Sequence, residues 1–213
     1  MADAPRVKVC GLTDPDEAAA CSATGVWAIG LVFASPSPRH LEVDRAVDVA
    51  AAIRPGVARV GVFVDPTLDE LARAVDRCGL SHVQVHGDGP DVDMIRDRIG
   101  CGVITGHPVD GPSAVDRARR SAADLVLLDA SVRGRHGGTG QVFDWELLAG
   151  GIGRPYILAG GLTPESVGRA VQRLLPWAVD VSTGVEWAPG RKDVAKVTAF
   201  LAAARDMTME VVE

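Results

Sequence analysis

The sequence has 213 residues, of which 47% are hydrophobic, and a formal net charge of -6 at pH 7. A chain of this length and apolar content can bury one substantial core, so we expect a single α/β domain spanning residues 1–213. The acidic balance excludes a general attraction to nucleic acid or to an anionic membrane, so any anion-binding site must be local.

The cysteine pattern and the amino terminus indicate a cytoplasmic protein. Cys10, Cys21, Cys78 and Cys101 lie far apart and form no C-x-x-C pair, which argues against a zinc site and predicts reduced thiols. The first residues contain no basic segment followed by an apolar run, and no stretch reaches membrane-spanning length. We therefore expect neither export nor insertion into a membrane.

Alternating strand and helix patterns run along the whole chain. Short apolar segments predict strands at residues 6–10, 26–33, 57–64, 82–86, 103–105, 125–129, 156–159 and 177–181. We expect a first helix after the cap and early proline at 13–17, and a second helix that ends at 53. Further helical patterns cover 65–78, 91–99, 113–122, 144–149, 164–174 and 192–204. Such an alternation predicts parallel strands with right-handed crossovers, and hence a closed (β/α)8 TIM barrel.

An open, doubly wound sheet is the competing architecture. The dinucleotide-binding pattern G-x-G-x-x-G does not follow the first predicted strand, and glycine-rich turns come instead at the end of the chain. These observations favour the barrel.

Two turns near the end of the chain have the composition of an anion-binding site. Gly160 and Gly161 follow the seventh predicted strand, and Ser182, Thr183 and Gly184 follow the eighth. Glycine lets backbone N–H groups approach a ligand closely, and in TIM barrels a phosphate commonly binds at the loops after these two strands. Each turn taken alone fits an ordinary strand-to-helix connection better than an anion site, since glycine is the default residue of tight turns.

Two residues at strand ends could exchange protons with a substrate. Cys10 ends the first predicted strand, with Lys8 on the same face, so a working thiolate is possible; a buried cysteine that only packs is the alternative. Asp129 ends the sixth strand, where burial would raise the pKa of a carboxyl group and suit it to act as an acid, although it could also cap a helix or loop.

Three further polar residues are candidates for substrate contacts. Arg39 follows two prolines in residues 35–39, and a stiff loop could hold its guanidinium over the pocket, where it would match a carboxylate. His86 could donate a hydrogen bond in the pocket or pack in the core, and Asp180 could bind a sugar hydroxyl or stabilise its own turn. The glycine-rich, basic residues 133–140 could form a mobile lid, but they lack the lysine and hydroxyl residue of a P-loop.

A set of motifs spread over nearly the whole chain resembles phosphoribosylanthranilate isomerase, an enzyme family of tryptophan biosynthesis. The motifs are Lys8-Val-Cys-Gly-Leu-Thr13, Gly30-Leu-Val-Phe33, Ser35-Pro-Ser-Pro-Arg39, Val60-Gly-Val-Phe-Val64, Val83-Gln-Val-His-Gly87, Leu127-Leu-Asp129, Gly137-Gly-Thr-Gly140, Phe143-Asp-Trp145, Leu158-Ala-Gly-Gly-Leu162 and Asp180-Val-Ser-Thr-Gly-Val-Glu186. Their order and spacing are much more specific than any one motif. Thr183 stands where the family often has a second serine, which keeps the hydroxyl group.

The resemblance implies a (β/α)8 barrel that converts N-(5-phosphoribosyl)anthranilate to 1-(2-carboxyphenylamino)-1-deoxyribulose 5-phosphate without a metal or an organic cofactor. It implies that Cys10 is the general base, Asp129 the general acid and Arg39 the ligand of the anthranilate carboxylate. His86 and Asp180 resemble substrate-binding positions. The phosphate-binding positions implied are Gly160, Gly161, Ser182, Thr183 and Gly184. A monomer and a homodimer are both compatible with the sequence.

Other functions on the same fold remain to be separated from this one. The sister isomerase of histidine biosynthesis acts on a substrate with two phosphates, and we expect an aspartate at the end of its first strand and a second glycine- and serine-rich turn after its third. Here those places hold Cys10 and residues 63–66, which also disfavours a dual-specificity enzyme. A phosphosugar-binding barrel without catalysis would need the two glycine turns but neither Cys10 nor Asp129.

Overall fold

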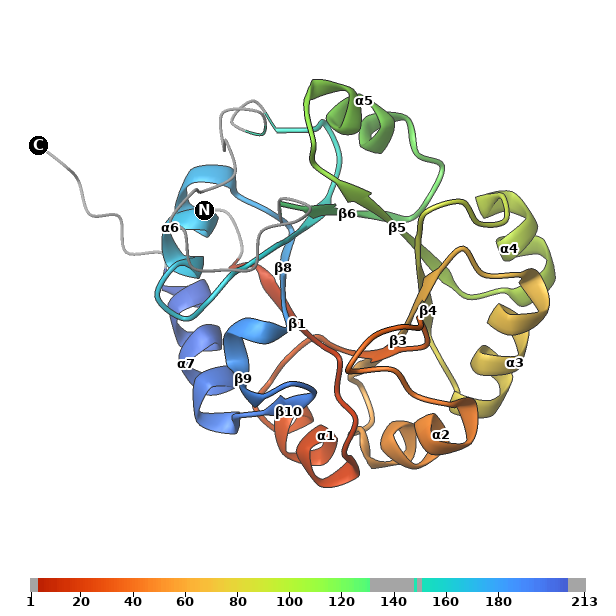
Figure 1. The fold of residues 1–213 in the computed structure, drawn as a ribbon. Helices are drawn as coiled ribbons and strands as arrows, with labels where there is room; N and C mark the ends of the chain where they lie inside the picture. The colour runs from red at the N-terminus through yellow and green to blue at the C-terminus, as the bar shows by residue number, and fades with distance from the viewer. Residues whose placement is uncertain (1–3, 131–147, 149–150, 207–213) are drawn as a thin grey trace, which may run out of the picture.

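The protein is a closed barrel of parallel strands surrounded by helices. The computed structural model describes residues 4–130, 148 and 151–206. Eight strands pair in chain order from β1 to β8, and β8 pairs with β1 to close the ring. Figure 1 looks along the barrel axis, with the strands in the centre and the helices outside them. The predicted (β/α)8 architecture is confirmed, and the open doubly wound sheet is excluded.

The elements agree with the predicted alternation in order. The strands of the barrel are β1 (Arg6–Cys10), β2 (Ala28–Val32), β3 (Ala58–Val64), β4 (His82–His86), β5 (Gly102–Pro108), β6 (Leu125–Asp129), β7 (Tyr156–Ala159) and β8 (Ala178–Val181). The helices are α1 (Pro15–Ser22), α2 (Val43–Ala52), α3 (Leu68–Cys78), α4 (Val92–Ile99), α5 (Pro112–Arg120), α6 (Val167–Leu174) and α7 (Val194–Arg205). The helix predicted at 144–149 falls almost wholly outside the described residues.

Local capping explains where several helices begin. The Asp14 side chain accepts hydrogen bonds from the backbone N–H groups of Asp16 and Glu17, and Pro15 occupies the first turn of α1. Thr67 and Glu70 form a reciprocal capping box at the start of α3. Our prediction that the last helix starts at residue 192 is wrong, because Asp193 caps the backbone N–H groups of Ala195 and Lys196 and α7 begins at Val194.

The first strand sorts its side chains between two environments. Val7 and Val9 are fully buried in the apolar layer between the strands and the helices. Because successive strand residues point to opposite faces, Lys8 and Cys10 face the interior of the barrel. The interior itself is filled with apolar side chains: Ala28, Val60, Ile104, Leu125, Leu127, Ile157, Ala159 and Ala178. Lys8 and Cys10 therefore share the barrel interior with a packed apolar core.

A short hairpin that the sequence did not predict follows β8. After the 3-10 turn η2 (Thr183–Val185), the antiparallel strands β9 (Glu186–Ala188) and β10 (Arg191–Lys192) pair with each other. Figure 1 shows this hairpin beside α1 and α7, at the side of the barrel that carries β1. The hairpin places Glu186 and Lys192 close to the loop that contains Arg39.

Across residues 4–130, 148 and 151–206, none of the helices combines the length and the apolar character needed to cross a membrane.

Candidate active site

The residues predicted to act on a substrate meet at the carboxyl ends of the strands. Cys10 ends β1, His86 ends β4, Asp129 ends β6, and Asp180 lies one residue before the end of β8. Electrostatic interactions couple Asp180 to both Cys10 and Asp129, and couple Asp129 to His86. Closure of the barrel thus brings these four side chains to one rim, as expected for parallel strands.

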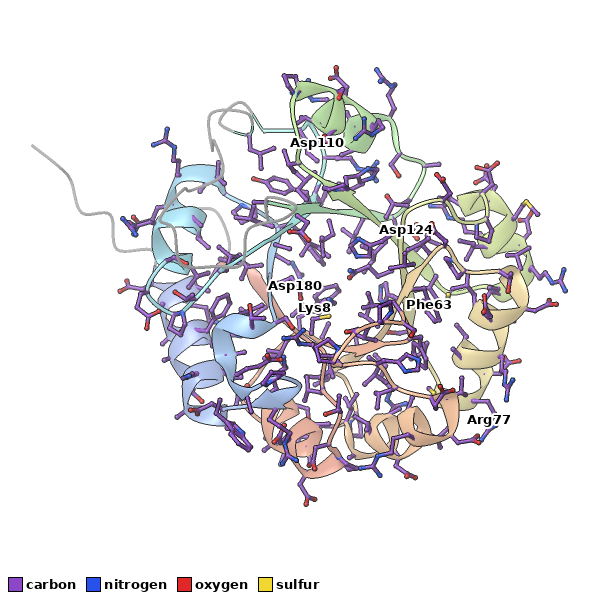
Figure 2. The ribbon with its side chains drawn as sticks, in the orientation of Figure 1. Lys8, Phe63, Arg77, Asp110, Asp124 and Asp180 are labelled. Carbon is purple, nitrogen blue, oxygen red and sulfur yellow. The ribbon has the colours of Figure 1, made fainter. Side chains whose placement is uncertain are left out.

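A buried ion pair joins the first and last strands beneath this rim. The Lys8 ammonium donates a hydrogen bond to Asp180 Oδ1 at 2.9 Å, and the Lys8 side chain is wholly buried. Figure 2 shows the two side chains next to each other inside the ring of strands. Burial by itself lowers the pKa of Lys8, but the charges of Asp180 and Cys10 outweigh it and raise the pKa, so the ammonium stays charged.

The Cys10 thiol lies in a tight and largely dry position. Its side chain packs with Val32 and Val62, and a Cβ added to Gly30 would lie 2.7 Å from the sulfur. Burial raises the pKa of the Cys10 thiol, while the positive charges of Lys8 and Lys192 favour the thiolate. Burial and the charge of Asp180 outweigh the two cations, so the pKa of Cys10 is raised and the resting group is a thiol; Lys8 and Lys192 reduce the cost of the negative charge that forms when it loses its proton.

His86 is held as a neutral ring. Its Nε2 lies 2.7 Å from Gln84 Nε2, and the close approach of the Gly106 backbone leaves no space for a side chain beside the ring. Burial lowers the pKa of His86 and outweighs the opposing effect of the nearby Asp129, so the imidazole is neutral at pH 7. A neutral ring can donate or accept one hydrogen bond, which suits it to contact a hydroxyl group.

Arg39 has an internal partner that the sequence analysis missed. Its Nε and Nη2 donate to the two carboxylate oxygens of Glu186 at 2.7 and 2.6 Å, although the residues are far apart in sequence. Lys192, wholly buried, donates to the same carboxylate at 2.7 Å. The only sequence signal for Glu186 was its place at the end of the last motif. Lys192 gave no signal of a role at this site, because the sequence pattern placed it in the last helix.

The two glycine-rich turns lie against each other, as predicted. Gly160 and Gly161 have φ values of 103° and 65°, which favour glycine. A Cβ added to Gly184 would clash with the Leu162 carbonyl oxygen, so the turn after β8 packs directly on the turn after β7. Thr183 is exposed at the start of η2. Together the turns offer backbone N–H groups and a hydroxyl group at one edge of the rim.

Ser182 makes a hydrogen bond within the protein. Its hydroxyl donates to the Cys10 carbonyl oxygen at 3.0 Å, and Lys192 Nζ lies 3.1 Å from the Ser182 carbonyl oxygen. The side chain therefore ties β8 to β1, and its hydroxyl proton is engaged within the protein in the structure as described.

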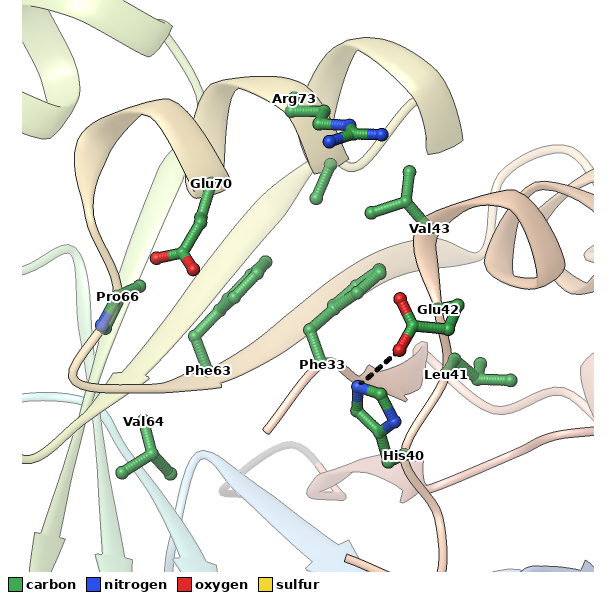
Figure 3. Close-up of a pocket in the computed structure, with 11 residues that line it drawn as sticks. Phe33, His40, Leu41, Glu42, Val43, Phe63, Val64, Pro66, Glu70 and Arg73 are labelled. Carbon is green, nitrogen blue, oxygen red and sulfur yellow. Dashed lines mark ion pairs between the residues drawn. The ribbon is translucent and has the colours of Figure 1, made fainter. Parts of the chain in front are cut away.

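A separate pocket opens beside the rim, between α2 and α3. It has a volume of about 260 Å³, and Figure 3 shows His40, Glu42, Glu70 and Arg73 around the stacked rings of Phe33 and Phe63. None of the candidate residues named above lines it. The two side chains predicted to act as base and acid, Cys10 and Asp129, lie in the strand-end cluster and not in this pocket.

Metal ligation finds no support in the described part of the chain, because residues 4–130, 148 and 151–206 contain no group of three or more His, Cys, Asp or Glu side chains placed to hold an ion. The expected lid at 133–140 lies outside the described residues.

Comparison with known proteins agrees with this geometry. The family model described as "N-(5'phosphoribosyl)anthranilate (PRA) isomerase" matches residues 7–203. N-(5'-phosphoribosyl)anthranilate isomerase of Pseudomonas aeruginosa is 41% identical over 212 residues, covering 95% of this chain and 96% of the relative.

Two solved structures have the same fold over nearly their full length. Phosphoribosyl anthranilate isomerase from Thermotoga maritima is 33% identical, with a TM-score of 0.83 and coverage of 94% of this chain and 98% of that one. A phosphoribosyl anthranilate isomerase in complex with reduced 1-(o-carboxyphenylamino)-1-deoxyribulose 5-phosphate is 32% identical, with a TM-score of 0.80 and the same coverage. From the family match and the extent of these similarities, the chain belongs to the N-(5'-phosphoribosyl)anthranilate isomerase family.

Proposed function

We propose that this protein is a cytoplasmic phosphoribosylanthranilate isomerase of tryptophan biosynthesis, with Cys10 and Asp129 as its acid-base pair. The family membership supports the reaction. The residue roles are supported by one observation above all: Cys10 and Asp129 end strands on different sides of the ring, and both interact electrostatically with Asp180 between them. A sugar bound over Asp180 would have a thiol on one side and a carboxyl group on the other.

The mechanism requires two proton transfers. Asp129 donates a proton to the ring oxygen of the ribose, the bond from this oxygen to C1′ breaks, and the nitrogen lone pair forms the C=N bond of a Schiff base. The Cys10 thiolate then removes the proton from C2′, and the electron pair neutralises the iminium nitrogen to give an enolamine, which tautomerises to the ketone. Lys8 and Lys192 stabilise the thiolate form of Cys10. Each positioned acid or base typically contributes about a hundredfold to ten-thousandfold in rate.

Binding fixes the sugar between these groups. The substrate carries a different anion at each end, a phosphate at one and an aromatic carboxylate at the other. Gly160, Gly161, Gly184, Thr183 and the backbone of Ser182 would hold the phosphate. Arg39, which lies over Gly11 after the end of β1, would meet the carboxylate, with His86 and Asp180 contacting the sugar hydroxyl groups. Holding both ends places C2′ near the thiol and converts the reaction into an oriented, unimolecular step.

The experiment is a turnover assay with N-(5-phosphoribosyl)anthranilate and purified protein. The fluorescence of the aromatic amine disappears on rearrangement, so a decaying signal is expected. A flat trace, with the substrate nevertheless bound, would identify a phosphosugar-binding barrel instead. Turnover of the histidine-pathway substrate with two phosphates, at a comparable rate, would contradict the proposed specificity. Sedimentation in the same preparation distinguishes a monomer from a homodimer.

A further inference from the structure

A largely buried cluster of three charged side chains lies where the β9–β10 hairpin meets the loop after β2. The Glu186 carboxylate accepts hydrogen bonds from Arg39 and Lys192 and from the backbone N–H of Gly190, the last at 3.3 Å. Only 7% of the Glu186 side chain is exposed, so the carboxylate is nearly inaccessible to solvent. Burial alone would raise the pKa of Glu186, but the Arg39 and Lys192 partners lower it, and the carboxylate is ionised.

The way Arg39 is bound leaves part of its guanidinium for a ligand. Arginine has about five N–H donors in a planar fork. Glu186 engages one edge, formed by Nε and Nη2, in bidentate fashion. The side chain also passes over Gly11, where a Cβ would clash with Arg39 Cδ, and it interacts electrostatically with Cys10. Within residues 4–130, 148 and 151–206, Nη1 makes no hydrogen bond, so the second edge, formed by Nη1 and Nη2, keeps N–H groups that could bind a second carboxylate.

The charge balance decides whether Glu186 would compete with a substrate or assist it. A carboxylate paired with Arg39 alone would cancel the guanidinium charge and repel an incoming anion. Lys192 supplies a second buried cation on the same carboxylate, so the cluster keeps one net positive charge. A further carboxylate is therefore attracted to Arg39 even while Glu186 stays bound to its other edge.

We infer that Glu186 is a positioning residue for the isomerase reaction. It holds the Nε and Nη2 edge of the Arg39 guanidinium, so that the other edge, formed by Nη1 and Nη2, binds the aromatic carboxylate of the substrate. Lys192 offsets the charge of Glu186. This inference rests on the proposed function. Glu186 does not touch the reacting atoms in this scheme and acts through Arg39, which would otherwise have to be ordered by the substrate itself.

The test is a double-mutant cycle between Glu186→Gln and Arg39→Ala, measured as KM and kcat for N-(5-phosphoribosyl)anthranilate. Glutamine keeps the shape but loses the charge that orients the guanidinium. We expect Glu186→Gln to raise KM about tenfold, as for the loss of one charge-assisted hydrogen bond, with kcat changed by less than about threefold. In the Arg39→Ala background the same change should leave KM within about twofold, because there is no guanidinium left to orient.

Two controls separate positioning from a general effect on the hairpin. Glu17 binds Arg191 Nε at 2.6 Å and the Lys192 backbone N–H at 2.8 Å, and so ties the same hairpin to α1 without contacting Arg39. Glu17→Gln should leave KM within about twofold of wild type. Inhibition by inorganic phosphate, which lacks a carboxylate, should be unchanged in Glu186→Gln.

The remaining outcomes overturn either the positioning role of Glu186 or the proposed function itself. An unchanged KM in Glu186→Gln, or an equal increase in the wild-type and Arg39→Ala backgrounds, overturns the positioning role while leaving the isomerase assignment intact. Wild-type protein that does not turn over the substrate overturns the proposed function and this inference with it. If Glu186→Gln does not fold, as judged by circular dichroism, Glu186→Asp takes its place in the cycle, with a smaller KM increase that must likewise vanish when Arg39 is replaced.

Discussion

Lys8 and Asp180 are cross-strand partners at the seam where the barrel closes. Their Cα atoms are paired in the register between β1 and β8, and Lys8 Nζ lies 2.9 Å from Asp180 Oδ1. The pair thus connects the beginning of the chain to its last barrel strand, directly below the thiol of Cys10. Its charges serve both the fold and the proposed chemistry, and the two contributions can be measured separately.

Removing the lysine should destabilise the protein strongly. Lys8→Met keeps most of the side-chain volume but leaves Asp180 buried without its cation. Breaking one half of a buried ion pair typically costs about 3–5 kcal/mol in the free energy of unfolding. Urea unfolding followed by circular dichroism measures this change.

The matched control is the double variant Lys8→Met/Asp180→Asn, which removes both charges and should recover a large part of the lost stability. If the free energy of unfolding of Lys8→Met lies within about 1 kcal/mol of the wild-type value, the ion pair does not contribute to stability as a buried pair of this kind should.

Replacing either member of the proposed acid-base pair should abolish most of the turnover. We expect Cys10→Ala and Asp129→Asn each to lower kcat by about a hundredfold to ten-thousandfold, because each removes one positioned proton-transfer group. Steady-state fluorescence measures kcat, and titration with reduced 1-(o-carboxyphenylamino)-1-deoxyribulose 5-phosphate measures whether binding survives.

Cys101 provides the comparison, since it precedes β5 at the opposite end of the barrel and is only partly buried. Cys101→Ala should keep full activity. Turnover within a few-fold of wild type in both Cys10→Ala and Asp129→Asn would remove the assignment of these residues.

The substitution Gly184→Ala, which adds one methyl group, should weaken phosphate binding. The new Cβ would meet the Leu162 carbonyl oxygen, which belongs to the backbone, so the turns after β7 and β8 must move apart. We expect KM to rise about tenfold or more, since loss of a charge-assisted hydrogen bond has an effect of this size. Inhibition by inorganic phosphate should weaken in parallel.

Gly100→Ala is the matched substitution away from the site. Gly100 has a φ of 71° and no atom within 4 Å of an added Cβ, so it tests the backbone cost of alanine alone. It should lower stability by about 1–2 kcal/mol without changing KM. Equal KM values for Gly184→Ala and wild type would show that the packing of the two turns does not matter for phosphate binding.

Stability should fall as the solution becomes mildly acidic. Burial lowers the pKa of His82, with Asp124 only partly opposing it, and the pKa values of His86 and His107 are lowered as well. The unfolded state, in which histidine has a pKa near about 6.5, therefore binds more protons than the folded state below this pH. The stabilisation is complete above the unfolded pKa and is lost as pH falls towards and through the lowered folded values.

Urea unfolding at several pH values between 7.5 and 5 measures this loss, and His82→Gln should reduce its slope by removing one of the titrating groups. His82 lies at the start of β4, where Trp27 packs edge-on against its ring at a centroid distance of 5.9 Å, so this variant leaves the candidate active site untouched. Stability that rises as pH falls over this range would contradict the sign of the shifts.

Several features of this protein were determined by the sequence itself. Apolar segments such as Leu125–Asp129, and the glycine turns after β7 and β8, depend on the local pattern of residues, so the order of the strands and the residues at their ends could be read directly. The motif spacing likewise identified the family. The start of α7 was missed by two residues because the cap at Asp193 forms with backbone groups that the pattern does not reveal.

Only the tertiary structure decided which charges meet. Lys8 and Asp180 are separated by 172 positions, and Arg39 and Glu186 by 147. Such pairs depend on closure of the barrel and on the β9–β10 hairpin, whose two short strands give almost no periodic signal. The sequence could thus place a thiol, a carboxyl group and an arginine near one rim. The partners that set their charge and orientation come from segments brought together only when the first and last strands join.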